Sequence, residues 1–318
     1  MSTKIFYFSA PDNSLQIARD IAKGMGNAVV LPIAEIKTNE SGWSERRKSH
    51  NTLTKWNKKK HMPARISIVL AFALVTLVTF NNIDRRREMI EAHEPIIVEF
   101  PLRGEWLSPN SPGTKIPSHG TDQLGTRYAY DFIQVDWERK GWPAYRVSLP
   151  QYLIFGVPLN KYYCWGQEVY APCDGIIVHA EDGYEERERT NLLLDMSNAY
   201  KNAHYFNPKK DNIQSVAGNY IIMECGNQVY AALVHLQTGS IQVSVGQSVK
   251  KGEIIGKVGH SGNSFAPHLH FQLMDSSDIS TANGLPCAFE QYEVFQDGKW
   301  QKVVNGIPTD KDRIRFGS

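Results

Sequence analysis

The last two-thirds of the chain alternates short apolar runs with glycine- and proline-rich turns, which is typical of a β-rich domain. Five of these runs predict strands, at residues 96–100, 168–170, 175–179, 220–223 and 229–234. Helical spacing is weak here, apart from a short helix expected near residues 190–203. We therefore expect a mainly β domain of antiparallel strands at residues 95–300, followed by a tail at residues 301–318.

The first 37 residues follow a different pattern. Two apolar runs, at residues 4–9 and 29–34, predict strands around a segment with helical spacing at residues 13–25, which together make a βαβ unit. This opening resembles the start of flavodoxin-like domains, where a loop binds the flavin phosphate. Pro11 removes a backbone donor from that loop, and no further βα units follow. We therefore expect a partial flavodoxin-like unit at residues 1–37 that does not bind FMN.

A basic linker and an apolar run come next. Residues 38–63 are polar and basic, and residues 66–80 contain no charged residue, glycine or proline. Extended to residues 64–83, the run reaches the ~20 residues that cross a bilayer. Lys and Arg residues flank it on both sides, which favours a transmembrane helix over a buried core helix. Eight of them lie between Arg46 and Arg65 and three at 85–87, so the positive-inside rule places the N-terminus in the cytoplasm and the β domain outside.

Charge and cysteine content narrow the picture only slightly. A net charge of +2 indicates no particular partner, and we expect no nucleic acid. The four cysteines form no Cys-x-x-Cys pair, which argues against a thiolate zinc site. We expect all four to be packed or free thiols.

The segment Pro267-His-Leu-His-Phe-Gln272 carries the first candidate chemistry. Side chains alternate along a strand, so His268 and His270 share one face while Leu269 and Phe271 point into the core. Two imidazoles on one face can share a metal centre, one as a ligand and the other acting on water.

Three further residues join this motif. His119 lies in a glycine-containing loop, and Asp131 lies in the aromatic segment Tyr128-Ala-Tyr-Asp-Phe132. A carboxylate in such an apolar strand needs a partner, either a metal ion or a buried arginine. Asp122, in the loop beside His119, is the rival carboxylate. His235 ends an apolar strand and gains meaning only in combination with the other histidines.

The ordered set resembles the lysostaphin/LytM-type zinc metallopeptidases, which cleave peptides of bacterial peptidoglycan. The resemblance covers about residues 95–293 and includes Gly-x-Ser-Gly-Asn-Ser-x-x-Pro-His-Leu-His-Phe at 259–271. It implies a groove of antiparallel strands and one Zn²⁺ held by His119, Asp131 and His270. It also implies that His235 and His268 act on the water and the tetrahedral intermediate.

One departure from the family pattern concerns the carboxylate. The family usually has His-x-x-x-Asp, whereas here Asp122 comes one residue early and Asp131 lies twelve positions after His119. We favour Asp131, because a strand framed by aromatic residues fixes a carboxylate better than a loop does. We interpret His260 as a turn residue.

The resemblance implies a zinc metalloendopeptidase acting on peptidoglycan or another peptide, and the charge bias around the apolar run places that domain at the outer face of a bacterial cytoplasmic membrane. The alternative is a catalytically silent scaffold or activator of cell-wall hydrolases. A biotinyl- or lipoyl-like carrier is disfavoured, because the hairpin at 241–256 has no lysine in a Met-Lys-Met-like turn. The sequence does not specify which peptide bond is cut.

Overall fold

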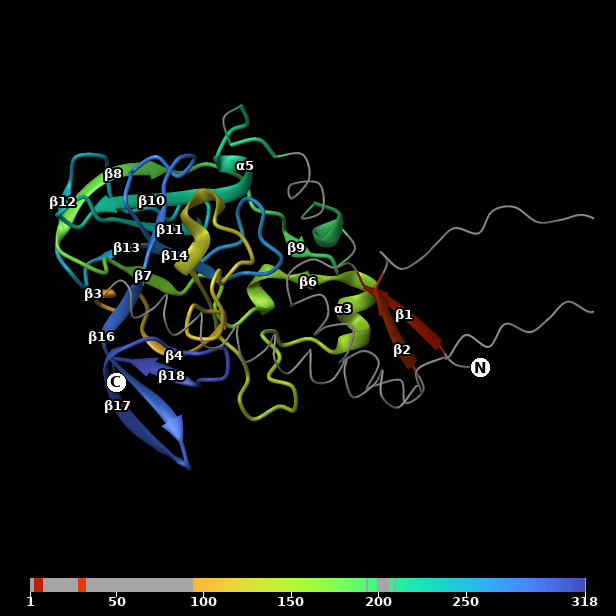
Figure 1. The fold of residues 1–318 in the computed structure, drawn as a ribbon. Coiled ribbons are helices and arrows are strands. Elements are labelled where there is room, and N and C mark those ends of the chain that lie inside the picture. Colours follow the sequence, from red (N-terminus) through yellow and green to blue (C-terminus); the bar gives the residue numbers. More distant parts are fainter. Residues whose placement is uncertain are drawn as a thin grey trace, which may run out of the picture. The chain divides into compact units, whose positions relative to one another are not determined.

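A computed structural model describes residues 3–7, 28–32, 94–192, 194–198, 206–208 and 210–317. The chain divides into two compact units, Met1–Glu88 and Met89–Ser318. In the first unit, β1 (Thr3–Tyr7) and β2 (Ala28–Pro32) pair in parallel, close to the two strands expected there (Figure 1). The expected helix at 13–25, the linker and the apolar run at 64–83 lie outside the described residues. Within the described residues, no helix is long and apolar enough to span a bilayer.

Twelve strands of the second unit form one sheet (Figure 1). Ten follow one another in the order β12 (Ser248–Val249), β8 (Gly175–Glu181), β10 (Asn219–Glu224), β11 (Tyr230–Leu236), β14 (Leu269–Met274), β5 (Tyr130–Ile133), β4 (Gly104–Asn110), β18 (Ile314–Phe316), β16 (Cys287–Gln296) and β17 (Lys299–Gly306). In addition, β15 (Gly284–Leu285) pairs with β14, and β3 (Ile96–Val98) pairs with β16. Neighbouring strands of this sheet are antiparallel, except β3 and β16, so the expected mainly β class is confirmed.

The remaining described elements are short. Two strand pairs lie off the main sheet, β13 (Ile254–Lys257) with β7 (Glu168–Tyr170) and β6 (Val157–Pro158) with β9 (Arg189–Thr190). Helical elements are α3 (Leu149–Phe155), α5 (Gln214–Ala217) and the 3-10 turns η2 (Gln123–Tyr128) and η3 (Leu159–Lys161). Helical residues also occur at 192 and 194–198, within the helix expected near 190–203.

The C-terminal residues differ from the expectation. Residues 301–318 were expected to be a tail, but they contribute most of β17 and all of β18 to the main sheet. The turn between β16 and β17 explains why. Asp297 and Gly298 both have positive φ, at 50° and 75°, as the tight turn of a two-residue hairpin requires, and Asp-Gly is a strong hairpin signal.

Alternation along β14 sets which side chains reach the site. Leu269, Phe271 and Leu273 are buried in the main core, as predicted for the first two. They pack with fully buried aromatic residues of other strands, including Phe132 of β5 and Phe289 of β16, whose rings lie 5.9 Å apart. Each such buried side chain stabilises the fold by about 1.5–3 kcal/mol, which fixes the register that turns His270 to the opposite face.

The expectation of four free or packed thiols is wrong for two cysteines. Cys173 and Cys225 form a disulfide, whereas Cys164 and Cys287 are buried free thiols. The two bonded residues are 52 positions apart, so no spacing motif marks them. Pairing of β8 with β10 places Glu224 opposite Ile176, and this brings the flanking cysteines together.

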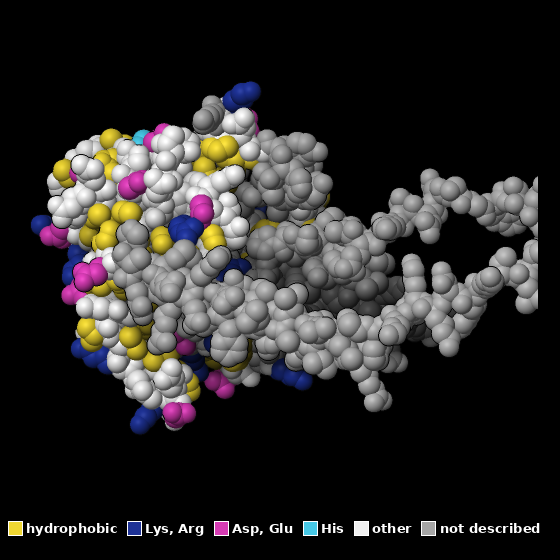
Figure 2. Space-filling model, viewed as in Figure 1, with side chains coloured by type: hydrophobic (Ala, Val, Ile, Leu, Met, Phe, Trp, Pro, Cys, Tyr) yellow, Lys and Arg dark blue, Asp and Glu magenta, His cyan; other side chains and the backbone are white. Residues whose placement is uncertain are grey.

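Acidic and basic side chains are mixed on one face of the molecule. On the face drawn in Figure 2, acidic and basic side chains of described residues are interspersed. This face therefore offers no continuous basic surface of the kind that binds a nucleic-acid backbone.

Candidate metal centre

The strand register brings Asp131 next to His270. In the antiparallel pairing of β5 with β14, these two residues lie directly opposite each other. Such positions hold their Cβ atoms about 5 Å apart, so side chains on the same face meet. On the other side of β5, Asn110 of β4 lies opposite Asp131 and donates to its Oδ2 at 2.7 Å.

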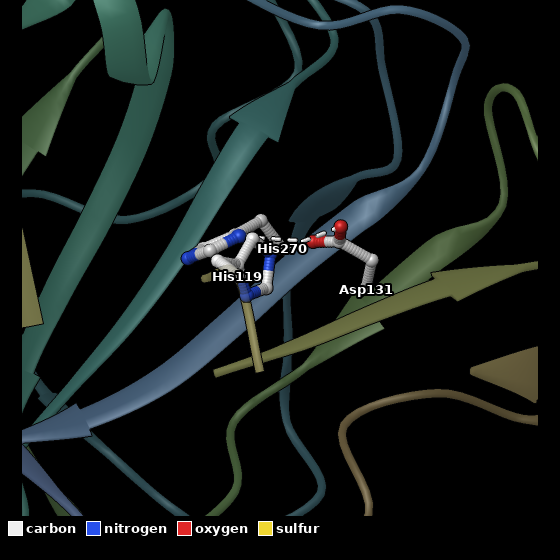
Figure 3. Close-up of side chains that lie close together, drawn as sticks. All are labelled: His119, Asp131 and His270. Carbon is white, nitrogen blue, oxygen red and sulfur yellow. Dashed lines mark hydrogen bonds and ion pairs between the residues drawn. The ribbon is translucent and has the colours of Figure 1, made fainter. Parts of the chain in front are cut away.

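His119 joins this pair from the loop that precedes η2 (Figure 3). Its Nε2 lies 3.0 Å from Asp131 Oδ2, and His270 Nδ1 lies 2.9 Å from Asp131 Oδ1. One ligand atom from each residue lies within 4.8 Å of the other two. The structure thus brings together the three residues that the sequence pointed to as metal ligands.

Asp122, the rival carboxylate, lies elsewhere. Its side chain is 61% exposed and forms an ion pair with Arg127 at 2.6 Å. Asp131 is 12% exposed, and within the described residues the polar side chains close to its oxygens are histidines and Asn110 rather than an arginine. The geometry therefore favours Asp131 for the site.

Outer hydrogen bonds fix the tautomer of His270. Its Nε2 lies 2.8 Å from Gln272 Oε1, and the amide of Gln272 donates from Nε2 to the Leu124 carbonyl at 2.8 Å. The Gln272 oxygen must therefore accept, so the proton of neutral His270 is on Nε2 and the lone pair is on Nδ1. Gly125 permits this contact: it has φ +72°, and a Cβ there would lie 2.9 Å from Gln272 Nε2.

His119 is oriented in the same way by Ser118. The Ser118 hydroxyl donates to the Thr126 carbonyl at 3.2 Å and accepts from His119 Nδ1 at 3.0 Å. This leaves the lone pair of His119 on Nε2, facing Asp131.

These tautomers provide a test of whether a metal ion fits. The lone pairs of His119 Nε2 and His270 Nδ1 both face the Asp131 oxygens. Attraction to His119 and His268 outweighs the effect of burial and holds the pKa of Asp131 well below its usual range. Burial lowers the pKa of His119, despite the attraction of Asp131, which favours neutral imidazole. Two imidazole nitrogens and a carboxylate that converge in this way suit a divalent cation such as Zn²⁺.

A β-bulge directs His235 to the same place. In the pairing of β10 with β11, Asn219 lies opposite Leu236 but Ile221 lies opposite Leu233, so β11 holds one extra residue. His235 sits at this irregularity with φ +63°. Without the extra residue, alternation would turn His235 to the core side with Leu233. Its ring instead lies 4.7 Å from that of His268 and 6.0 Å from that of His270.

The two further histidines differ in proton affinity. Burial and the nearby His268 and His270 hold the pKa of His235 well below its usual value, so His235 is neutral. Burial also acts on His268, but Asp131 outweighs it and raises the pKa of His268. The Nδ1 atoms of these rings face backbone carbonyls, of Ser261 at 2.9 Å and of Ala266 at 2.7 Å. Each Nδ1 therefore carries a proton, and Nε2 is the atom available for proton transfer.

The supporting residues were not anticipated from the sequence. Gln272 had a usable signal, because it shares the alternation of His268 and His270 along β14. Ser118 and Asn110 had none, since their roles depend on the loop and on strand pairing. His260, interpreted as a turn residue, is buried and hydrogen-bonded.

The sheet is mainly antiparallel and carries a His–Asp–His group with two further histidines beside it in space. This combination is typical of a metallopeptidase domain. The sequence profile of Peptidase family M23 matches residues 159–282, so the chain contains a domain of this family. This confirms the resemblance to lysostaphin/LytM-type peptidases. The match includes His235, His268 and His270, whereas His119 and Asp131 precede it. The flavodoxin-like interpretation of residues 1–37 gains no support.

Two curated proteins are similar to this chain over short stretches. The peptidoglycan DD-endopeptidase ShyA of Vibrio cholerae is 40% identical over 58 residues, which are 18% of this chain and 13% of that protein. An uncharacterized metalloprotease of Haemophilus influenzae is 38% identical over 57 residues, 18% of this chain and 12% of that protein. The aligned regions are thus a small part of these relatives.

Solved structures give weaker likenesses. A zinc-containing peptidase from Vibrio cholerae is 18% identical, and its TM-score is 0.28. The alignment covers 60% of this chain and 41% of the peptidase. The catalytic domain of lysostaphin from Staphylococcus simulans is 22% identical, with 57% and 88% covered and a TM-score of 0.26.

Proposed function

We propose that this chain is a zinc metalloendopeptidase that hydrolyses peptide bonds in bacterial peptidoglycan. The observation that carries the proposal is the convergence of two imidazole lone pairs on the Asp131 carboxylate, beside two further histidines. The family match over residues 159–282 supports a peptidase. The substrate class follows the name of the related peptidoglycan endopeptidase.

His119, Asp131 and His270 would hold the zinc ion. Bound there, zinc would supply Lewis acidity, which polarises a peptide carbonyl and makes water more acidic. His268 Nε2 would take the proton from the attacking water and pass it to the leaving amine. His235 Nε2, the acceptor nitrogen of a neutral ring, would accept a hydrogen bond from the attacking water, while the carbonyl of Ser261 holds its ring.

Digestion of purified peptidoglycan tests this function. The full chain, purified in detergent, is expected to release fragments with new amino groups and no new reducing sugar ends. A zinc chelator should stop the release, and added Zn²⁺ should restore it. A protein that binds zinc without cleaving would be a scaffold or activator. A protein that binds no zinc, or that cuts glycosidic bonds, would contradict the proposal.

We infer also that residues 64–83 anchor the chain in the bacterial cytoplasmic membrane, with the N-terminus inside and the peptidase domain outside. The charge bias around that apolar run supports this orientation. The disulfide between Cys173 and Cys225 supports it as well, since such bonds persist mainly in oxidising compartments.

The thiol state of the chain in its host tests this location. Alkylation of the unfolded, unreduced chain is expected to modify two of the four cysteines, Cys164 and Cys287, and reduction should expose the other two. Mass spectrometry of the peptides distinguishes the pairs. Four modified cysteines before reduction would argue for a reducing compartment.

A further inference from the structure

The segment between β8 and β10 contacts the loop that precedes β14 through Arg187. Its Nη2 donates to the Ser264 carbonyl at 2.7 Å and to His260 Nε2 at 2.9 Å. Its Nη1 forms an ion pair with Asp195, a carboxylate that is almost fully buried and also accepts from the Asn191 amide at 2.8 Å. The guanidinium is thus held by Asp195 on one side. On the other side it contacts the loop that precedes β14.

The direction of these hydrogen bonds fixes the proton of His260. An arginine side chain can only donate, so His260 Nε2 must accept and the proton of the ring lies on Nδ1. Burial, with the charge of Arg187, lowers the pKa of His260 to about 3, which keeps the ring neutral. His260 Nδ1 lies 3.1 Å from Ser264 Oγ and donates to it.

Ser264 connects His260 to His268. Its hydroxyl donates to the Ala266 carbonyl at 2.7 Å, so its oxygen accepts from both histidines. His268 Nδ1 lies 3.1 Å from that oxygen and 2.7 Å from the Ala266 carbonyl. Because both neighbours of Nδ1 accept, the proton is held on Nδ1. Nε2 then faces Asp131, with its nitrogen 3.5 Å from Oδ1.

We propose that Arg187 is a positioning residue, which holds His268 in the ring orientation and tautomer that leave Nε2 free for proton transfer. Arg187 touches none of the reacting groups. It fixes the Ser264 backbone directly and the Ser264 hydroxyl through His260. The kinetic part of this inference rests on the proposed peptidase function, whereas the orientation of His268 does not.

Two substitutions at Arg187 in the full chain test the inference. Arg187→Met is similar in length and has no donor, so kcat for peptidoglycan hydrolysis should fall about tenfold, the lower end of the effect of losing a residue that supports a ligand or catalytic group. KM and zinc content should stay unchanged. Arg187→Lys keeps a donor-only cation and should recover part of the loss. Arg189→Met is the matched control, since Arg189 lies in the same segment and donates to the Phe155 carbonyl.

The ¹⁵N resonances of the His268 imidazole give a readout independent of activity. In the parent protein, Nδ1 should show the pattern of a protonated nitrogen and Nε2 that of an acceptor, with assignment from His268→Ala. Arg187→Met should shift or broaden both signals, and Arg189→Met should not. Unchanged kcat and unchanged His268 signals in a folded Arg187→Met protein would overturn the inference.

Ser264→Ala covers the case in which Arg187→Met does not fold. This variant keeps the Arg187 bond to the backbone and removes only the hydroxyl, so it should reproduce the loss in kcat and the change at His268. Unaltered values would overturn the inference as well. Failure of the parent protein to cleave peptidoglycan would contradict the proposed function, while the ¹⁵N signals would still test the link from Arg187 to His268.

Discussion

Replacement of Asp131 by asparagine is expected to remove zinc from the protein and to abolish hydrolysis. The carboxylate is the only anionic group of the three proposed ligands, and the lone pairs of His119 and His270 both face it. A neutral amide cannot offset the charge of a divalent ion there. The zinc content should fall from about one ion per chain to near zero. Activity should fall by more than the roughly 10–100-fold typical of losing an outer partner.

The fold should survive this substitution. An asparagine can donate to one of the imidazole lone pairs and accept from Asn110, so no buried charge is left without a partner. Metal analysis after dialysis, with circular dichroism of the same sample, separates loss of the ion from loss of structure.

Asp122→Asn is the matched control. Asp122 is the nearest alternative in sequence, but it is exposed and paired with Arg127. Its replacement should leave zinc content and hydrolysis unchanged, because surface ion pairs contribute about 0–1 kcal/mol. Loss of zinc in Asp122→Asn, with zinc retained in Asp131→Asn, would assign the metal to the loop carboxylate instead.

The sequence predicted those features of the candidate site that depend only on which face of a strand a side chain occupies. Alternation placed His268 and His270 on one face and Leu269 and Phe271 in the core, and Asp131 opposite the aromatic face of its strand. These assignments need only the period of a strand, which local sequence carries. The choice of Asp131 over Asp122 rested instead on the expectation that a strand framed by aromatic residues fixes a carboxylate better than a loop does.

Features that depend on pairing between distant strands could not be predicted in this way. The bulge that turns His235 to the site arises from the register of β10 against β11. The disulfide depends on the pairing of β8 with β10, and the contact of Gln272 with the turn at Leu124 depends on Gly125, whose close approach to β14 leaves no room for a side chain. The hairpin of β16 and β17 is different, since Asp297-Gly298 was a local signal that the assignment of a tail overlooked.

His268→Ala is expected to lower kcat by about 10²–10⁴-fold while the protein keeps its zinc. His268 Nε2 is 3.5 Å from Asp131 Oδ1, farther than the nitrogens of His119 and His270, and its Nδ1 is held by Ala266. Its removal should therefore take away proton transfer and leave the proposed ligands in place. His179→Ala, a histidine of β8 with no part in the site, is the control and should retain activity. Measuring zinc content and initial rates on the same samples decides the role. Loss of zinc in His268→Ala would make His268 a ligand, and full activity would remove it from the proposed mechanism.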